Sequence, residues 1–415
     1  MAIDIMVIGL GKLGLPLAAV CAGAGFSVLG YDQEICAVSA ASTSKPRFPE
    51  PNLAETLQAN HSRLFFTNGF PKNIRDCKAI FICVPTPSEQ DGTFSSEQVE
   101  DVLKEIAGRV KVTDVHKPPI CIASTLFPGT MEKLAERFSA LRLFYTPTMI
   151  ALGNVLEGLR HPDFQLVGTS FEDGADVSQV FVQIHTVNSR PPPVPLTHFM
   201  SYESAEIAKL AANAFVTMKI SFANRIGEIC EVFPGANRRD ILETIGQDKR
   251  IGEECLVAGA PYGGPCFPRD VEAIAQLDPL LGYSIYKMNE AQVKAIALRA
   301  HNACPEGKPI LIMGVSYKPG LPILDGSPSM AVHAELTRFY KRKCYLWDSC
   351  GTMDENPDWT LNALQEGHEY VNDTVIFPSL DIGCLILMHA TYGEGAQARW
   401  IRDFEGAIID PWMRP

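Results

Sequence analysis

No apolar run in this 415-residue chain reaches the roughly 18 residues that a membrane-spanning helix needs. The first apolar stretch, residues 5–17, is interrupted by glycines and by Lys12, so it predicts a strand and a turn in place of a signal peptide. The twelve cysteines form no C-x-x-C pair and no zinc-ligand spacing. Without an export signal, we expect reduced thiols, no bound metal, no membrane partner and a cytoplasmic location.

The chain also lacks an excess of positive charge, internal repeats and low-complexity tracts. Its formal net charge is −12, which argues against nucleic acid as a partner. Hydrophobic residues make up 46% and charged residues 20% of the chain, as in an ordinary soluble protein. A length of 415 residues is enough for two or three domains.

The amino-terminal segment combines a strand, a glycine-rich turn, a helix and a second strand. Residues 2–8 are apolar and lead into a G-x-G-x-x-G turn at residues 9–14, and a second strand at residues 27–31 ends at Asp32. Such glycines let a pyrophosphate approach the helix N-terminus, and the acid accepts hydrogen bonds from the adenosine ribose while repelling a 2′-phosphate. The spacing predicts a dinucleotide site that prefers NAD to NADP. A tight turn without a ligand is the alternative.

Apolar strands alternate with helices through about residue 195. Strands are expected at residues 78–84, 119–123, 141–145 and 164–168, helices at 96–110 and 174–184, and a helix, a loop and another helix within 33–77. The order predicts a doubly wound parallel sheet. Polar residues follow three strand ends, where such sheets bind ligands. Among them, Thr86 is a candidate for contacting the cofactor, although a plain turn explains it equally well.

A proline-rich linker at residues 190–195 precedes a long helix at about 204–233. Lys209 and Asn213 lie four residues apart on it and therefore share a face, which their apolar neighbours partly enclose. A snorkelling lysine beside a polar asparagine is the alternative. The length of the helix and its small side chains favour a homodimer formed around it.

The remaining chain predicts a second, smaller α/β domain. Helices are expected at residues 271–276, 285–304 and 329–340, and strands at 309–315, 343–347, 385–388 and 406–409. The predicted fold is therefore α/β, with two Rossmann-like doubly wound parallel-sheet domains joined by a long central helix.

One cysteine lies on a distinctive turn, residues 262–270. Cys266 is flanked by two glycines and two prolines, and Asp270 follows four residues later. The glycines permit close approach of a ligand and the prolines stiffen the turn, so the thiol is a candidate nucleophile. A buried structural cysteine is the alternative.

These motifs together resemble the UDP-glucose/GDP-mannose dehydrogenase family, which oxidises C6 of a nucleotide sugar to a carboxylate. The resemblance covers nearly the whole chain and rests on segments 9–18, 84–87, 91–92, 124–130, 206–215, 250–252, 263–268 and 314–318. It implies three domains: NAD-binding at residues 1–195, central with the cysteine loop at 196–303, and UDP-sugar-binding at 304–415. The stretch from Arg250 to Gly264 is most similar to the UDP-glucose branch.

The resemblance implies a covalent mechanism. The Cys266 thiolate captures the aldehyde as a thiohemiacetal between two hydride transfers to NAD, and water releases the acid from a thioester. Lys209 and Asn213 would stabilise the developing oxyanion, Asp270 would position water or relay a proton, and Thr125 would contact water and cofactor. The implied cofactor contacts are Gly9, Gly11, Lys12, Leu13, Gly14, Asp32, Pro85, Thr86, Thr125 and Arg269. The implied substrate contacts are Lys209, Asn213, Arg250 (from a neighbouring subunit), Gly259, Tyr262, Gly263 and Lys318, with the loop 255–259 wrapping the sugar nucleotide.

The chain departs from the family pattern in three places. Thr148 and Leu152 stand where the family has two glutamates, the first of which is thought to be the base for the hydrolytic water. After Lys318, the family's Thr, Asp and Arg are replaced by Leu321, Ile323 and Asp325, and the change to Asp325 puts repulsion near the NAD pyrophosphate. The family's Thr-Glu-Trp is replaced within residues 389–392.

Three interpretations remain open. In the first, the chain is a working dehydrogenase in which Asp270 or another group activates water. In the second, it is specialised for another nucleotide sugar in natural-product or surface-glycan synthesis. In the third, its reaction stops at the thioester or aldehyde, or it serves as a binding or assembly subunit. We hypothesise that hydrolysis is the slow step. Two rival classes are a non-catalytic sugar-nucleotide binder, disfavoured by the intact cysteine turn, and a thiol-dependent aldehyde dehydrogenase, disfavoured by the whole-length resemblance.

Overall fold

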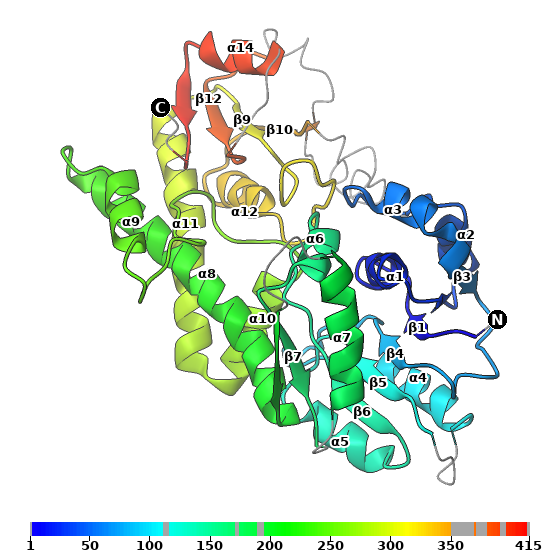
Figure 1. Ribbon diagram of the computed structural model, residues 1–415. Coiled ribbons are helices and arrows are strands. Elements are labelled where there is room, and N and C mark those ends of the chain that lie inside the picture. The colour runs from blue at the N-terminus through cyan, green and yellow to red at the C-terminus, as the bar shows by residue number, and fades with distance from the viewer. Residues whose placement is uncertain are drawn as a thin grey trace. The chain divides into compact units, whose positions relative to one another are not determined.

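The computed structural model describes residues 2–110, 116–170, 174–188, 195–349, 369–370, 380–390 and 396–412. The chain divides into two compact units, Met1–Ala211 and Ala212–Pro415, and each contains one sheet (Figure 1). The predicted α/β fold with two Rossmann-like sheets is confirmed. The three-domain division stays a prediction, and residues 190–194 of the expected linker lie outside the described residues. No helix within the described ranges is both long and apolar enough to span a membrane.

The first unit is an eight-stranded sheet in the order β3-β2-β1-β4-β5-β6-β7-β8. The strands are β1 (Ile5–Ile8), β2 (Val28–Tyr31), β3 (Leu64–Thr67), β4 (Ala79–Ile82), β5 (Pro119–Ile122), β6 (Arg142–Tyr145), β7 (Phe164–Gly168) and β8 (Leu196–Met200). The helical segments are α1 (Gly14–Gly23), α2 (Ile35–Ser42), α3 (Leu53–Ala59), the 3-10 turn η1 (His61–Arg63), α4 (Glu97–Ala107), α5 (Thr130–Arg137), α6 (Val155–Arg160) and α7 (Ala175–Asn188).

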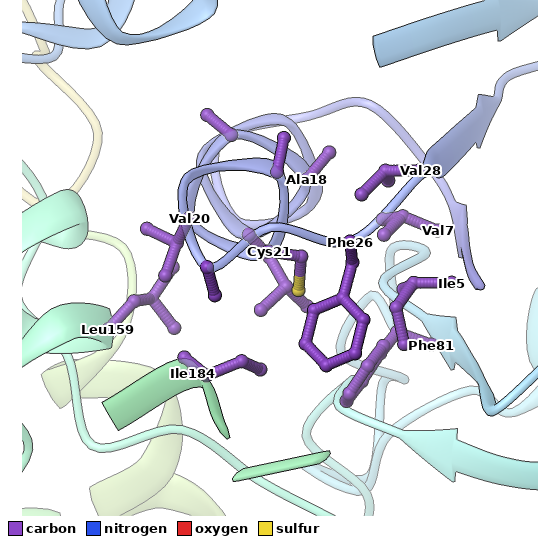
Figure 2. Packing of buried hydrophobic residues seen from close by; sticks show 14 of the residues in the cluster. Ile5, Val7, Ala18, Val20, Cys21, Phe26, Val28, Phe81, Leu159 and Ile184 are labelled. Carbon is purple, nitrogen blue, oxygen red and sulfur yellow. The ribbon is translucent and has the colours of Figure 1, made fainter. Parts of the chain in front are cut away.

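Alternate residues of the central strand enter opposite faces of this sheet. Ile5 and Val7 of β1 pack with α1, α6 and α7. Met6 and Ile8 pack with α4, α5 and the first turn of the long helix α8 (Tyr202–Val232). Figure 2 shows part of the first of these layers, where Val20 of α1 lies toward Leu159 of α6 and Cys21 of α1 lies beside Phe26. Because both faces are covered, the central strands β1, β4 and β5 are apolar at every position, which made them recognisable in the sequence.

Two strands were not predicted, and they are the two edges of the sheet. β3 lies in the segment expected to hold only helices and a loop, and β8 lies directly before the long helix. An edge strand is paired on one side only, and three of the five β8 residues are exposed, so neither segment needs a continuous apolar run.

The expectation of a wholly parallel first sheet was wrong at one junction. β6 and β7 are antiparallel and pair only at Tyr145 and Gly168, while β7 and β8 are parallel to each other. The helix between β6 and β7, α6, has only six residues, which is short for the crossover that parallel pairing requires. A side chain at position 168 would press against Tyr145 and Ala205, so Gly168 permits this close meeting.

The long helix α8 (Tyr202–Val232) begins in the first unit and continues into the second, confirming its prediction. The second unit adds α9 (Arg238–Gly246), α10 (Phe267–Leu277), α11 (Pro279–Ala303), α12 (Pro328–Ala334), a π-helical turn η2 (Glu335–Phe339) and α14 (Ala396–Arg402). Its parallel sheet has the order β11-β10-β9-β12-β13, formed by β9 (Ile310–Met313), β10 (Cys344–Trp347), β11 (Glu369–Tyr370), β12 (Cys384–Leu387) and β13 (Ala407–Ile409).

The predicted starts of two helices in the second unit were wrong. α10 begins at Phe267 and α11 at Pro279, both several residues earlier than expected. Pro268 and Pro279 occupy the first turn of their helices, where the missing N–H has no intrahelical partner to lose.

Candidate active site

The glycine-rich turn between β1 and α1 has two glycines that the fold itself requires. Gly9 has φ +91°, and its N–H donates to the Tyr31 carbonyl at 2.8 Å. A Cβ at Gly9 would collide with the Cys83 carbonyl, and a Cβ at Gly14 would collide with the Gly9 carbonyl. Both glycines are therefore explained by packing within the chain.

Gly11 differs, because a Cβ there would meet no atom of the chain within 4 Å. The chain alone gives no packing reason for glycine at this position, whereas close approach of a pyrophosphate would supply one. Gly11 and Lys12 are exposed, and the first turn of α1 carries no acidic residue that would repel a phosphate. Gly9, Gly11 and Gly14, with Lys12 and Leu13 between them, fit a dinucleotide phosphate.

Asp32, at the end of β2, also holds the glycine turn. Its Oδ2 accepts from the Leu10 N–H at 2.8 Å and its Oδ1 accepts from the Glu34 N–H at 2.9 Å. The carboxylate is partly exposed, so lone pairs not used by these N–H groups can accept from ribose hydroxyls. This arrangement fits NAD and disfavours a 2′-phosphate, as the sequence predicted.

Hydroxyl groups join the loops that follow β4 and β5. Thr86 is buried, and its Oγ1 donates to the Thr125 carbonyl at 2.7 Å. Ser124 Oγ donates to the Val84 carbonyl at 2.7 Å. Thr125 is thus held at the carboxyl edge of the sheet beside the Pro85–Thr86 loop, where the resemblance placed a cofactor contact.

Two buried charged residues on the first turns of α8 reach the neighbouring strand-end loops. Glu206 is 0% exposed and accepts from the Gly129 and Met131 N–H groups, each at 2.7 Å. Burial raises the pKa of Glu206 to about 7, against the opposing effect of these N–H donors. Lys209 is 7% exposed, and its Nζ donates to the Thr148 carbonyl at 2.9 Å.

The structure shows what stands at the two positions where the family has glutamates. Thr148 offers its main-chain carbonyl to Lys209, and Leu152 packs against the hydrophobic core that covers one face of the sheet. Neither side chain can serve as a carboxylate base there.

In the second unit, Cys266 is the N-cap residue of α10 and is exposed. Asp270, one helical turn later, is 3% exposed and accepts from Asn213 Nδ2 at 2.6 Å. Arg269 Nε lies 3.9 Å from Asp270 Oδ1. Within this unit, α8 and α10 bring Asn213 to Asp270, one helical turn after Cys266. The catalytic roles of these residues and of Lys209 stay a prediction.

The glycines before Cys266 pack directly on the loop that follows β9. The Gly264 N–H donates to the Gly326 carbonyl at 2.8 Å, and a Cβ at Gly264 would collide with the Tyr317 ring. This loop contains Lys318 and the departures at positions 321, 323 and 325. Leu321 is buried and Asp325 is exposed. The cysteine turn and the altered segment are thus in contact.

The third departure is only partly described. Within residues 389–392, His389 is buried and its Nε2 lies 2.9 Å from the Ser316 carbonyl oxygen. A Cβ at Gly314, which has φ +85°, would collide with the His389 ring. Thr391 and Tyr392 lie outside the described residues.

The expected substrate loop, residues 255–263, is held by side-chain amides of Asn and Gln residues that the sequence analysis did not identify. Asn224 Oδ1 accepts from the Gly259 N–H at 2.6 Å, and Asn289 Oδ1 accepts from the Tyr262 N–H at 2.9 Å. Gln292 Nε2 donates to the Gly259 carbonyl at 3.0 Å. Arg250, by contrast, is exposed in the single chain and pairs with Asp248.

A signal for some of these residues was present in the sequence. Buried polar residues recur along α8 every three or four positions, which is the spacing of one helix face. They are Glu206, Lys209, Thr217, Ser221 and Asn224, with the half-buried Asn213 between Lys209 and Thr217. Only Lys209 and Asn213 of this face were singled out.

Two family models and several known proteins match this chain. The model of the UDP-glucose/GDP-mannose dehydrogenase family, NAD binding domain, matches residues 3–185, and that of the central domain matches residues 203–294. A UDP-glucose 6-dehydrogenase of Bacillus subtilis is 32% identical over 347 residues, covering 79% of this chain and 76% of that protein.

Solved structures share the fold. A UDP-glucose dehydrogenase of Pyrobaculum islandicum superposes with a TM-score of 0.81 at 23% identity, over 99% of this chain and 98% of that one. A UDP-D-ManNAc dehydrogenase of Pyrococcus horikoshii gives a TM-score of 0.77 at 20% identity, over 99% and 96%. The chain therefore belongs to the UDP-glucose/GDP-mannose dehydrogenase family, as an NAD-binding oxidoreductase of the nucleotide-sugar dehydrogenase type.

Proposed function

We propose that this protein oxidises C6 of a UDP-hexose, with UDP-glucose as the first choice, to the uronic acid. The observation that carries the proposal is in the second unit, where the exposed Cys266 begins α10 and the first turn of that helix holds the buried Asp270, which accepts a hydrogen bond from Asn213 of α8. The 32% identical relative that is named a UDP-glucose 6-dehydrogenase supports the choice of hexose.

The proposed reaction has two oxidations followed by a hydrolysis, and different residues act in each. The glycine turn, Asp32 and the Thr86 and Thr125 loops would hold NAD, and Arg269 is proposed as a contact of its phosphates. NAD would accept one hydride in each of two oxidations, so that each sugar consumes two NAD molecules. Between these oxidations the Cys266 thiolate adds to the aldehyde carbon, forming a carbon–sulfur bond. After the second oxidation that carbon is a thioester carbonyl. Attack by water breaks the carbon–sulfur bond, releases the carboxylate and returns the thiol.

Charge develops on the C6 oxygen at each addition step. Lys209 and Asn213, on the polar face of α8, are proposed to stabilise it, since fixed cations and amide donors favour an oxyanion. Asp270 is proposed to orient water or relay its proton. The sugar nucleotide is proposed to contact Gly259, Tyr262, Gly263 and Lys318, and Arg250 of a second copy.

Hydrolysis of the Cys266 thioester is proposed to be the slowest step of the reaction, because positions 148 and 152 carry threonine and leucine where the family has glutamates. Purified protein supplied with NAD and UDP-glucose should form about two NADH for each sugar consumed, and a Cys266 acyl-enzyme should accumulate during turnover. Absorbance at the NADH band and mass spectrometry of the quenched protein measure the two quantities. Only one NADH per sugar would show that oxidation stops at the aldehyde. No NADH with any UDP-sugar, despite binding, would favour a non-catalytic member, and turnover with another UDP-hexose alone would reassign the substrate.

We also propose that two copies of the chain associate along α8. Figure 1 shows the helix as one long element. It exposes large apolar side chains at Ile207, Phe215, Phe222 and Ile229, spaced eight, seven and seven residues apart, which is close to the heptad spacing of paired helices. Sedimentation should give the mass of a dimer. The double variant Phe215→Glu, Phe222→Glu should sediment as a monomer, because it places charges in the contact. A monomeric unsubstituted protein at micromolar concentration would refute the association.

A further inference from the structure

Glu206 has no role in the mechanism above, yet it is a fully buried carboxylate. Its two oxygens accept from the Gly129 and Met131 N–H groups, 77 and 75 residues away in the sequence. These N–H groups belong to the start of α5, whose early amide groups have no partner within the helix. Burying a carboxylate costs free energy even when it is hydrogen-bonded, so the fold retains a costly group here.

The start of α5 has no cap of its own. An N-cap residue normally satisfies these amides with its own side chain, but Gly129, in the N-cap position with φ +85°, has none. Asparagine tolerates a left-handed conformation, but Asn52, which adopts it at the N-cap of α3, makes no side-chain cap hydrogen bond. A cap supplied from α8 instead connects the loop before α5 to the helix that carries Lys209.

The loop in question carries Thr125, and it is held at both ends. At its start, Thr86 Oγ1 donates to the Thr125 carbonyl and Ser124 Oγ donates to the Val84 carbonyl, each at 2.7 Å. At its end, Glu206 holds Gly129 and Met131. Lys209, three residues after Glu206, is fixed in turn by the Thr148 carbonyl. The first two turns of α8 therefore connect the loops after β5 and β6.

We propose that Glu206 is a positioning residue, which fixes the Thr125 loop relative to Lys209 by clamping the amino terminus of α5 onto α8. The inference depends on the proposed function only in that Thr125 and Lys209 are the groups used there. The clamp itself can be measured without turnover.

The test is Glu206→Gln, compared at a pH well above the Glu206 pKa of about 7 so that the carboxylate of the unsubstituted protein is ionised. The substitution removes the charge and offers an amide NH2 to one of the two N–H donors, so that at most one hydrogen bond remains. Amide hydrogen exchange in the segment 124–137 should accelerate at least about tenfold, because a charge-assisted hydrogen bond is lost there. In turnover, kcat should fall about a hundredfold while KM for the UDP-sugar changes less than about threefold, because the loop is misplaced and not removed. Glu206→Asp, which keeps the charge but shortens the reach, should give intermediate values for both.

Glu203→Gln is the matched control, because it removes a carboxylate from the first turn of the same helix that accepts neither amide. Its exchange and kcat should stay within about twofold of the unsubstituted protein. Unchanged exchange in segment 124–137 of Glu206→Gln would overturn the clamp, whether or not the protein turns over UDP-sugars. Faster exchange with unchanged kcat would overturn the positioning role in a protein that does turn over. If Glu206→Gln does not fold, Glu206→Asp decides the question by the same exchange measurement.

Discussion

Replacing Cys266 by serine is expected to lower uronic-acid formation by at least about a thousandfold, while leaving UDP-sugar binding within about threefold. A serine hydroxyl at neutral pH is a far weaker nucleophile than a thiolate, so the aldehyde would no longer be captured on the enzyme. The side chains are nearly isosteric, and Cys266 is exposed, so the fold should not change. Acid is measured by chromatography of the product, and binding by calorimetry with the UDP-sugar.

Cys36→Ser is the control for this experiment. Cys36 is also exposed and lies on α2, far in sequence from the proposed nucleophile, so its replacement should leave acid formation unchanged. If Cys266→Ser formed acid within about tenfold of the unsubstituted rate, the thiol would not be the nucleophile, and direct oxidation of an aldehyde hydrate would become the better explanation. Loss of binding as well as activity would indicate a structural role for Cys266.

Substitution of valine at Gly11 and at Gly14 should separate cofactor binding from folding. A side chain at Gly11 meets open space, so Gly11→Val should fold with an unchanged melting temperature. The same side chain would occupy the space proposed for the pyrophosphate, and we expect the Kd for NAD to rise about a hundredfold or more. Calorimetric titration with NAD measures this change.

Gly14→Val should instead destabilise the folded protein. Its Cβ would collide with the Gly9 carbonyl inside the turn, so the melting temperature should fall by many degrees or the protein should not fold. NAD affinity in Gly11→Val equal to that of the unsubstituted protein would contradict the placement of the cofactor at this turn. A well-folded Gly14→Val would contradict the packing explanation for that glycine.

The sequence was most informative where a signal is local. Strands β1, β4 and β9 are buried along their whole length, so they read as continuous apolar runs. The glycine turn and Asp32 also lie within one segment, residues 9–32. The edge strands β3 and β8 were not predicted, because a strand paired on one side needs little apolar character. The starts of α10 and α11 lie earlier than predicted, and each helix has a proline in its first turn, where proline does not interrupt a helix.

By itself, then, the sequence determined the fold class, the NAD-binding turn and the Cys266 turn, because backbone conformation and hydrophobic periodicity act over a few residues. Only the tertiary structure decided which polar groups meet. Asn213 reaches Asp270 across 57 residues, and Glu206 reaches Gly129 across 77. The tertiary structure also showed that a side chain at Gly14 would collide with the chain, whereas one at Gly11 would meet open space. Such contacts depend on how elements distant in sequence pack together, and no local pattern records that packing.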